Sequence, residues 1–219
     1  MNDALLRNVT STDWITIILS CSVLALVIAK SLYYNRFLNF IILPFNNKYI
    51  FLYNKKEKLS HWFNVFLFIF QVLNLALFIY ILNDIFSFSG QNKTLTLYFI
   101  ILGVLLIFFI VKIFFQLGNA FIFNISGEIT EYLFKKLSYL NYSSFVMFIA
   151  NILLTYVLND SKTVAYTSML IIILINAIGW VTVIKNYQKL ITNNFLYFIL
   201  YLCTLEIAPI VLIGDYFKD

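Results

Sequence analysis

The stretch WFNVFLFIFQVLNLALFIYIL, residues 62–82, decides the fold class because it contains no charged residue. A bilayer core of roughly 30 Å needs about 20 apolar residues in a helix that rises 1.5 Å per residue. Since lipid offers no partner to an unpaired backbone group, and such stretches are too long and continuous for barrel strands, we expect an all-α protein. Stretches of this length predict six membrane-spanning helices, over residues 14–33, 62–82, 95–115, 139–158, 164–184 and 193–213.

The composition of the whole chain supports a membrane protein. Of the 219 residues, 62% are hydrophobic and 11% are charged, whereas a soluble domain is about half apolar and a quarter charged. The mean hydropathy is +0.90. We therefore expect a single integral membrane domain over residues 1–219. Cys21 and Cys203 both fall inside predicted spans, and we interpret them as buried free thiols rather than as a disulfide.

The basic residues predict how the chain is threaded, because cytoplasmic loops carry an excess of Lys and Arg. Alternate loops with their flanks hold eleven of the fifteen: Lys30, Arg36, Lys48, Lys55, Lys56, Lys58, Lys112, Lys135, Lys136, Lys185 and Lys189. The opposite side holds four: Arg7, Lys93, Lys162 and Lys218. We expect both termini outside the cytoplasm and three basic loops inside it.

The second of these loops contains a predicted amphipathic helix. Ser126 can cap a helix over residues 127–137, with acidic residues near its start and Lys135 and Lys136 near its end, as the helix dipole prefers. The apolar side chains that share one face are Ile129, Tyr132, Leu133 and Leu137. This pattern predicts a separate helix that lies on the cytoplasmic surface of the membrane.

Polar residues inside the predicted spans form one candidate site. Glu206 is the one acidic residue deep in a span, and a carboxylate there is costly unless it is paired or protonated. Counting residues from the outer ends places Glu206, Asn74 and Asn151 at a similar depth, with Gln71 about one turn deeper. Two interpretations stay open: a neutral carboxylic acid that ties three helices together, and a relay for protons or a substrate.

The cytoplasmic lysines form a second candidate site, which comprises Lys55, Lys56, Lys58, Lys135 and Lys136. One interpretation is the topology signal together with binding to anionic headgroups of the lipid bilayer. The other is a docking surface for an acidic protein or for the RNA of a ribosome, since phosphates attract clustered lysines. Nothing in the sequence predicts binding to DNA.

The sequence predicts no catalytic residue, metal site or cofactor. His61 is the only histidine, it lies at the edge of a predicted span, and we interpret it as an interface residue rather than as a base. The chain has no glycine-rich phosphate loop and no Gly-x-Ser-x-Gly or His-Glu-x-x-His motif. A membrane enzyme is therefore the least favoured class of function.

The closing stretch FILYLCTLEIAP, residues 198–209, carries a resemblance to a known family. Within it, the specific part is the segment from Cys203 to Pro209, and Arg36-Phe37 and Asn119-Ala120-Phe121-Ile122 are further matches. The chain resembles an uncharacterised polytopic inner-membrane family of Bacteroidota, known as a domain of unknown function. The resemblance implies a Gram-negative inner membrane and lends no catalytic residue.

These observations favour a non-catalytic inner-membrane subunit or accessory factor of a cell-envelope complex, for protein export or insertion, which associates with other inner-membrane proteins. Ala25-x-x-x-Ala29 adds a small-residue face on which a second helix can pack. The alternative is a small proton-coupled transporter or channel that uses Glu206, Asn74 and Asn151. A subunit should co-purify with partners, whereas a transporter should work alone in liposomes.

Overall fold

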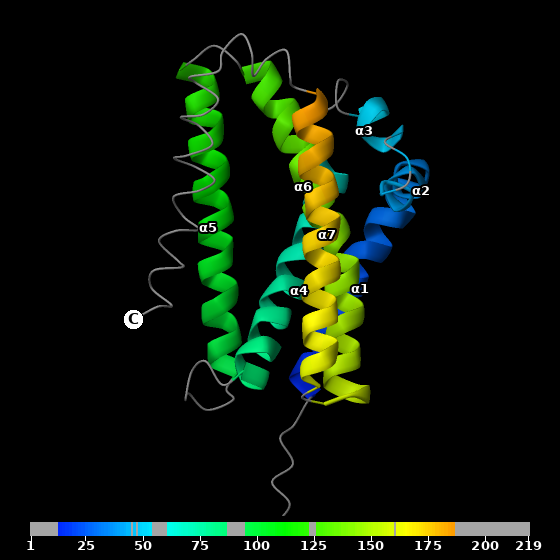
Figure 1. Ribbon diagram of the computed structural model, residues 1–219, viewed down its shortest axis with the longest axis vertical. Coiled ribbons are helices and arrows are strands. Elements are labelled where there is room, and N and C mark those ends of the chain that lie inside the picture. Colours follow the sequence, from blue (N-terminus) through cyan, green and yellow to red (C-terminus); the bar gives the residue numbers. More distant parts are fainter. Residues whose placement is uncertain are drawn as a thin grey trace, which may run out of the picture.

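The computed structural model describes residues 13–44, 46, 48–53, 61–86, 95–122, 126–159 and 161–186. These residues form helices joined by short turns, without a strand (Figure 1). In chain order the elements are α1 Asp13–Leu32, α2 Tyr34–Ile41, α3 Lys48–Tyr53, α4 Trp62–Phe86, α5 Leu95–Ile122, α6 Ser126–Ile152, the π-helical turn η1 Leu153–Val157, and α7 Lys162–Asn186.

Five helices are long and apolar enough to cross a membrane, which confirms the multi-pass prediction for this part of the chain. They are α1, α4, α5, α7 and the run Ile129–Val157 formed by α6 with η1. Four of the five start within two residues of the predicted spans. The predicted sixth span, residues 193–213, lies outside the described residues. Both termini also lie outside them, so the orientation stays a prediction.

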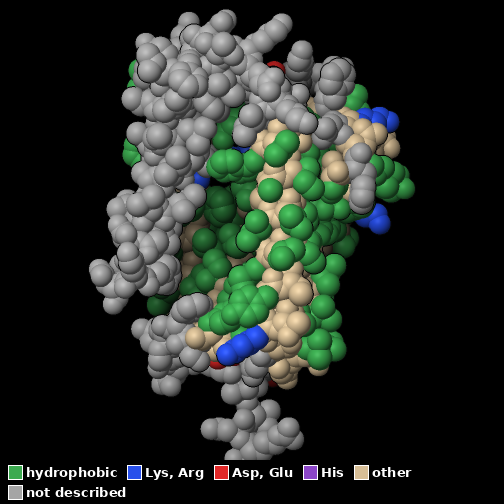
Figure 2. Space-filling model, viewed as in Figure 1, with side chains coloured by type: hydrophobic (Ala, Val, Ile, Leu, Met, Phe, Trp, Pro, Cys, Tyr) green, Lys and Arg blue, Asp and Glu red, His purple; other side chains and the backbone are tan. Residues whose placement is uncertain are grey.

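Helix α4 lies at the centre of the bundle, and α5 lies at its edge (Figure 1). Of the most apolar window of α4, 56% is buried inside the protein, against 11% for α5. Helix α1 packs on α4 through a stripe of small side chains, because Ser22, Ala25 and Ala29 are all buried. The predicted Ala25-x-x-x-Ala29 packing face is therefore confirmed. Hydrophobic side chains are the most frequent coloured side chains on the face shown in Figure 2.

The described part of the long first loop is folded against one end of the bundle. Its two short helices α2 and α3 lie beside the end of α1 (Figure 1). Between them, the side-chain oxygen of Asn46 accepts a hydrogen bond from the backbone N–H of Lys48, the first residue of α3, at 3.0 Å. The buried residues here form what we call the aromatic cluster, which includes Phe37, Phe40, Tyr49, Phe63, Phe134 and Tyr139.

The prediction of a separate surface helix over residues 127–137 is wrong. The structure has one continuous helix, α6, that starts at Ser126 and runs directly into the predicted fourth span. The sequence between Leu137 and Tyr139 contains no glycine or proline, so nothing stops the helix there. The apolar face that was expected to lie on lipid is buried by protein instead, because Ile129, Tyr132 and Leu133 are 8%, 9% and 1% exposed. Beside it, the ring of Phe134 stacks on that of Tyr49, 5.7 Å between centroids.

Candidate functional site

A seam of buried amides runs along the interface between α4 and α6. The side-chain amide nitrogen of Asn151 donates a hydrogen bond of 3.0 Å to the backbone oxygen of Asn74. The amide nitrogen of Asn74 donates in turn to the backbone oxygen of Phe70, at 2.8 Å. Both asparagines and Gln71 are at most 1% exposed. The predicted neighbourhood of Asn74 and Asn151 is thus confirmed, and Gln71 lies one turn away on the same helix.

The seam extends further toward the other end of the bundle than the sequence analysis recognised. Helices α4 and α6 run in the same direction (Figure 1), and Asn74 and Asn151 are 77 residues apart. Asn64 and Asn141 have the same separation and line one cavity. Each helix therefore carries the pattern Asn-x9-Asn at the same register. This repeated spacing is the sequence signal that could have found Asn64 and Asn141.

Several acceptors of the seam lack a hydrogen-bond donor among the described residues. They are the side-chain oxygens of Gln71, Asn74, Asn141 and Asn151. An unpaired buried oxygen costs about 1–3 kcal/mol, and native proteins keep few of them.

Immediately after Asn151 the helix widens into the π turn η1, in which the N–H of Leu158 donates to the oxygen of Leu153. Such turns are frequent at functional sites.

Glu206 and the two cysteines are further residues that were predicted to lie inside the spans. Glu206 lies outside the described residues, as does Cys203, so the contact of Glu206 with the seam stays a prediction. Cys21 is a free thiol that is exposed on α1, not buried in the bundle as predicted. The side of α1 that packs on α4 carries Ser22, Ala25 and Ala29, and Cys21 lies off that stripe.

The structure also contains a buried guanidinium group, at a residue that was predicted to be a charge in the first cytoplasmic loop. Arg36 of α2 is 4% exposed. Its guanidinium carbon lies 4.7 Å from the ring centroid of Tyr53 and 5.1 Å from that of Phe63. Cation–π attraction of this kind is strongest away from water. Arg36 thereby anchors the first loop to the start of α4.

Two ionisable residues beside Arg36 stay neutral at physiological pH. Burial raises the pKa of Tyr49 to about 12, although the nearby charge of Arg36 opposes the rise. The Tyr49 hydroxyl donates to the side-chain oxygen of Asn64 at 3.3 Å. Burial and then the charge of Arg36 lower the pKa of His61, whose ring nitrogen accepts the backbone N–H of Phe63. These contacts agree with the interpretation of His61 as a structural interface residue.

The predicted docking lysines fall in two groups. Lys55, Lys56 and Lys58 lie outside the described residues, directly after α3. Lys135 is 7% exposed, whereas docking needs its amine at the surface. Lys136 lies over the ring of Trp180, 5.7 Å from its centroid, and this contact ties α6 to α7. Any docking role therefore rests on the lysines that follow α3.

The fold defines a class: the chain is an α-helical protein with five helices able to cross a membrane, which makes it a multi-pass membrane protein. Residues 15–217 match a family described as a domain of unknown function (DUF4271), and the chain belongs to this family. No curated protein and no solved structure matches it. Among the described residues, no group of three or more His, Cys, Asp or Glu side chains could hold a metal ion.

Proposed function

We propose that this protein is a non-catalytic inner-membrane subunit or accessory factor of a bacterial cell-envelope complex for protein export or insertion. In this proposal both termini are periplasmic and the ends of the bundle that carry α2 and α3 face the cytoplasm. The charge asymmetry of the loops supports the orientation. The resemblance of the sequence to inner-membrane proteins of Bacteroidota supports the location.

The observation that carries the proposal is the folded first loop. Arg36, Phe40 and Tyr49 fix α2 and α3 to α4 and α6. Helix α3 ends at Tyr53, and Lys55, Lys56 and Lys58 follow within five residues. A helix that is already fixed in place loses little further entropy when a partner binds beside it. This arrangement suits docking to an acidic protein or to ribosomal RNA.

Charge reversal tests this docking surface. A variant with Lys55→Glu, Lys56→Glu and Lys58→Glu should lose chemical cross-links to its partner in native membranes, while its abundance and thermal stability stay unchanged. The matched control is Lys162→Glu, an exposed lysine at the opposite end of the bundle. The proposal predicts that the control keeps the cross-links. Equal cross-linking of both variants and the wild type would overturn the proposal that these lysines form a docking surface.

The buried amide seam favours a second candidate function, a small proton-coupled transporter or channel. Its support is the set of buried acceptor oxygens on Gln71, Asn74 and Asn151, which a protonated Glu206 or water could satisfy. Liposomes that contain the purified protein alone provide the test. A transporter should give a proton flux that Glu206→Gln abolishes at normal abundance. A structural, neutral Glu206 predicts no flux, and Glu206→Gln then preserves both folding and function.

A further inference from the structure

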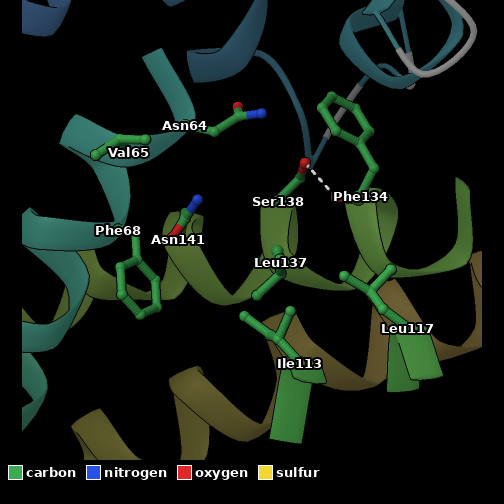
Figure 3. A pocket seen from close by; sticks show the side chains of 9 residues that line it. All are labelled: Asn64, Val65, Phe68, Ile113, Leu117, Phe134, Leu137, Ser138 and Asn141. Atoms are coloured by element: carbon green, nitrogen blue, oxygen red, sulfur yellow. Dashed lines mark hydrogen bonds between the residues drawn. The ribbon is translucent and has the colours of Figure 1, made fainter. Parts of the chain in front are cut away.

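A cavity of about 320 Å³ lies between α4, α5 and α6, near the aromatic cluster. Its volume is at the lower end of the roughly 300–1,000 Å³ typical of small-molecule sites. Figure 3 shows the lining side chains, with the α4 and α6 residues facing those of α5. The lining comprises Asn64, Val65, Phe68, Ile113, Leu117, Phe134, Leu137, Ser138 and Asn141.

The cavity has a polar side and an apolar side, and none of its nine lining residues is charged. The α5 side consists of Ile113 and Leu117. The α6 side carries Ser138 and Asn141, which are 4% and 5% exposed. An apolar wall facing a few buried polar groups is the usual form of a site for a small amphipathic molecule.

The hydrogen bonds of the polar side decide which chemical group fits there. The Ser138 hydroxyl already donates to the backbone oxygen of Phe134 at 2.7 Å, and the side-chain oxygen of Asn64 already accepts the hydroxyl of Tyr49. The side-chain oxygen of Asn141 is buried and receives no hydrogen bond from the described residues. The unused hydrogen-bonding atom of the cavity is therefore an acceptor, and a ligand that matches it must carry a hydrogen-bond donor.

We propose that this cavity binds a neutral amphiphile from the bilayer, whose hydroxyl group donates a hydrogen bond to the side-chain oxygen of Asn141. Its apolar chain or ring lies against Phe68, Ile113 and Leu117. Neutrality follows from the uncharged lining, since a charged headgroup would lose its hydration there without gaining an ionic partner. Burial of the apolar part and a hydrogen bond made away from water together provide the affinity.

The lateral position of α5 gives such a molecule a route from the bilayer. Helix α5 is the least buried of the five candidate spans and packs less extensively on α6 than α4 does. Figure 2 shows the surface hollowed beside α7, with hydrophobic side chains on the floor of the hollow. This inference does not depend on a docking partner, because it concerns α4, α5 and α6 and not the lysines that follow α3.

Photolabelling of the full chain in vesicles of phosphatidylethanolamine and phosphatidylglycerol tests the site. The probe is a diazirine-bearing hexadecanol, and its methyl ether is the comparison, because the ether keeps the chain but lacks the donor. The positions labelled are then identified by peptide mass spectrometry. We expect labels on the lining segments of α5 and α6, roughly five- to tenfold stronger with the alcohol, as one hydrogen bond provides.

Two variants and two matched controls complete the design. Asn141→Leu should lower labelling by the alcohol to the level of the ether, whereas Asn176→Leu should not, since Asn176 bonds to Ile172 of its own helix. Leu117→Trp should fill the cavity and abolish both labels. Phe121→Trp, one turn along α5 and 83% exposed, should abolish neither. Leu117→Trp changes a partly exposed side chain, so it tests the site even where Asn141→Leu fails to fold.

Three outcomes would overturn the proposal. Equal labelling by alcohol and ether would mean that an ordinary lipid chain enters the cavity without using Asn141. Absence of label from the cavity would mean that another occupant fills it, such as residues 193–213 of this chain or a second copy. Labelling that survives Leu117→Trp would place the probe elsewhere. None of these outcomes bears on the docking proposal, which the charge-reversal variants test separately.

Discussion

Gly179 of α7 permits a close approach between α6 and α7. A Cβ atom added at Gly179 would lie 2.6 Å from Cγ of Tyr139 and 2.9 Å from its Cβ. Tyr139 is 2% exposed and belongs to the aromatic cluster, so its ring has little room to move away. Because one of the close atoms is the Cβ of Tyr139, even a shorter side chain there would leave a contact. Gly179→Ala must therefore push α6 and α7 apart.

The cost can be worked out from two opposing terms. Forcing an extra methyl group into a well-packed interface costs about 1–3 kcal/mol, and three contacts below 3 Å place this site near the upper end. Replacing glycine by alanine inside a helix returns about 1 kcal/mol. The net loss of unfolding free energy is thus about 2 kcal/mol. Gly103→Ala and Gly118→Ala on α5 meet nothing within 4 Å, so only the favourable term applies to them.

This difference in stability is measured by heating the purified protein in detergent. The loss of its monodisperse gel-filtration peak reports unfolding. We expect Gly179→Ala to be less stable than the wild type and the two α5 variants to be at least as stable as the wild type. The separation between Gly179→Ala and Gly103→Ala should be about 3 kcal/mol. Equal stability of these two variants would refute the close packing of α6 on α7.

Three further predictions concern other parts of the described structure. Arg36→Met should lower the unfolding free energy by about 2 kcal/mol because it removes buried cation–π contacts with Tyr53 and Phe63; a denaturation curve that matches the wild type would contradict this. Tyr49 keeps its proton in the folded protein up to about pH 12, whereas the unfolded phenol ionises near 10.0. Stability should therefore fall as the pH rises through this window, by roughly 3 kcal/mol more in the wild type than in Tyr49→Phe, and parallel pH profiles would count against a buried Tyr49. In a Cys203→Ser background, exposed Cys21 should react with a membrane-permeant maleimide and not with a charged, impermeant one; rapid reaction with the charged reagent would show that this side of α1 is in water.

The spans could be predicted because the length of an apolar run depends on the bilayer and not on tertiary contacts. Residues 62–82 contain no charge, and α4 begins at the predicted residue. Counting depth along parallel helices was also enough to bring Asn74 and Asn151 together, since each residue of a helix advances by a fixed rise. The Asn151 to Asn74 hydrogen bond confirms that estimate.

The surroundings of the polar residues could not be predicted in the same way. A pattern of apolar residues shows which face of a helix is buried, but not whether lipid or protein covers it. The face of Ile129, Tyr132 and Leu133 therefore resembled that of a surface helix, although protein buries all three side chains in the structure. Likewise Arg36 and Lys135 were counted as loop charges, although aromatic rings and neighbouring helices bury both. The cavity beside Asn141 depends on three helices at once, which no single stretch of sequence reveals.

The most direct test of the central claim is to identify what accompanies the protein in its own membrane. The tagged full chain would be extracted in mild detergent, and the proteins that co-purify with it would be quantified by mass spectrometry. A subunit of an envelope complex predicts membrane proteins of export or insertion, or ribosomes, at stoichiometric level, lost in the Lys55→Glu, Lys56→Glu, Lys58→Glu variant. Recovery of the protein alone, as a monomer or homo-oligomer, would contradict the claim.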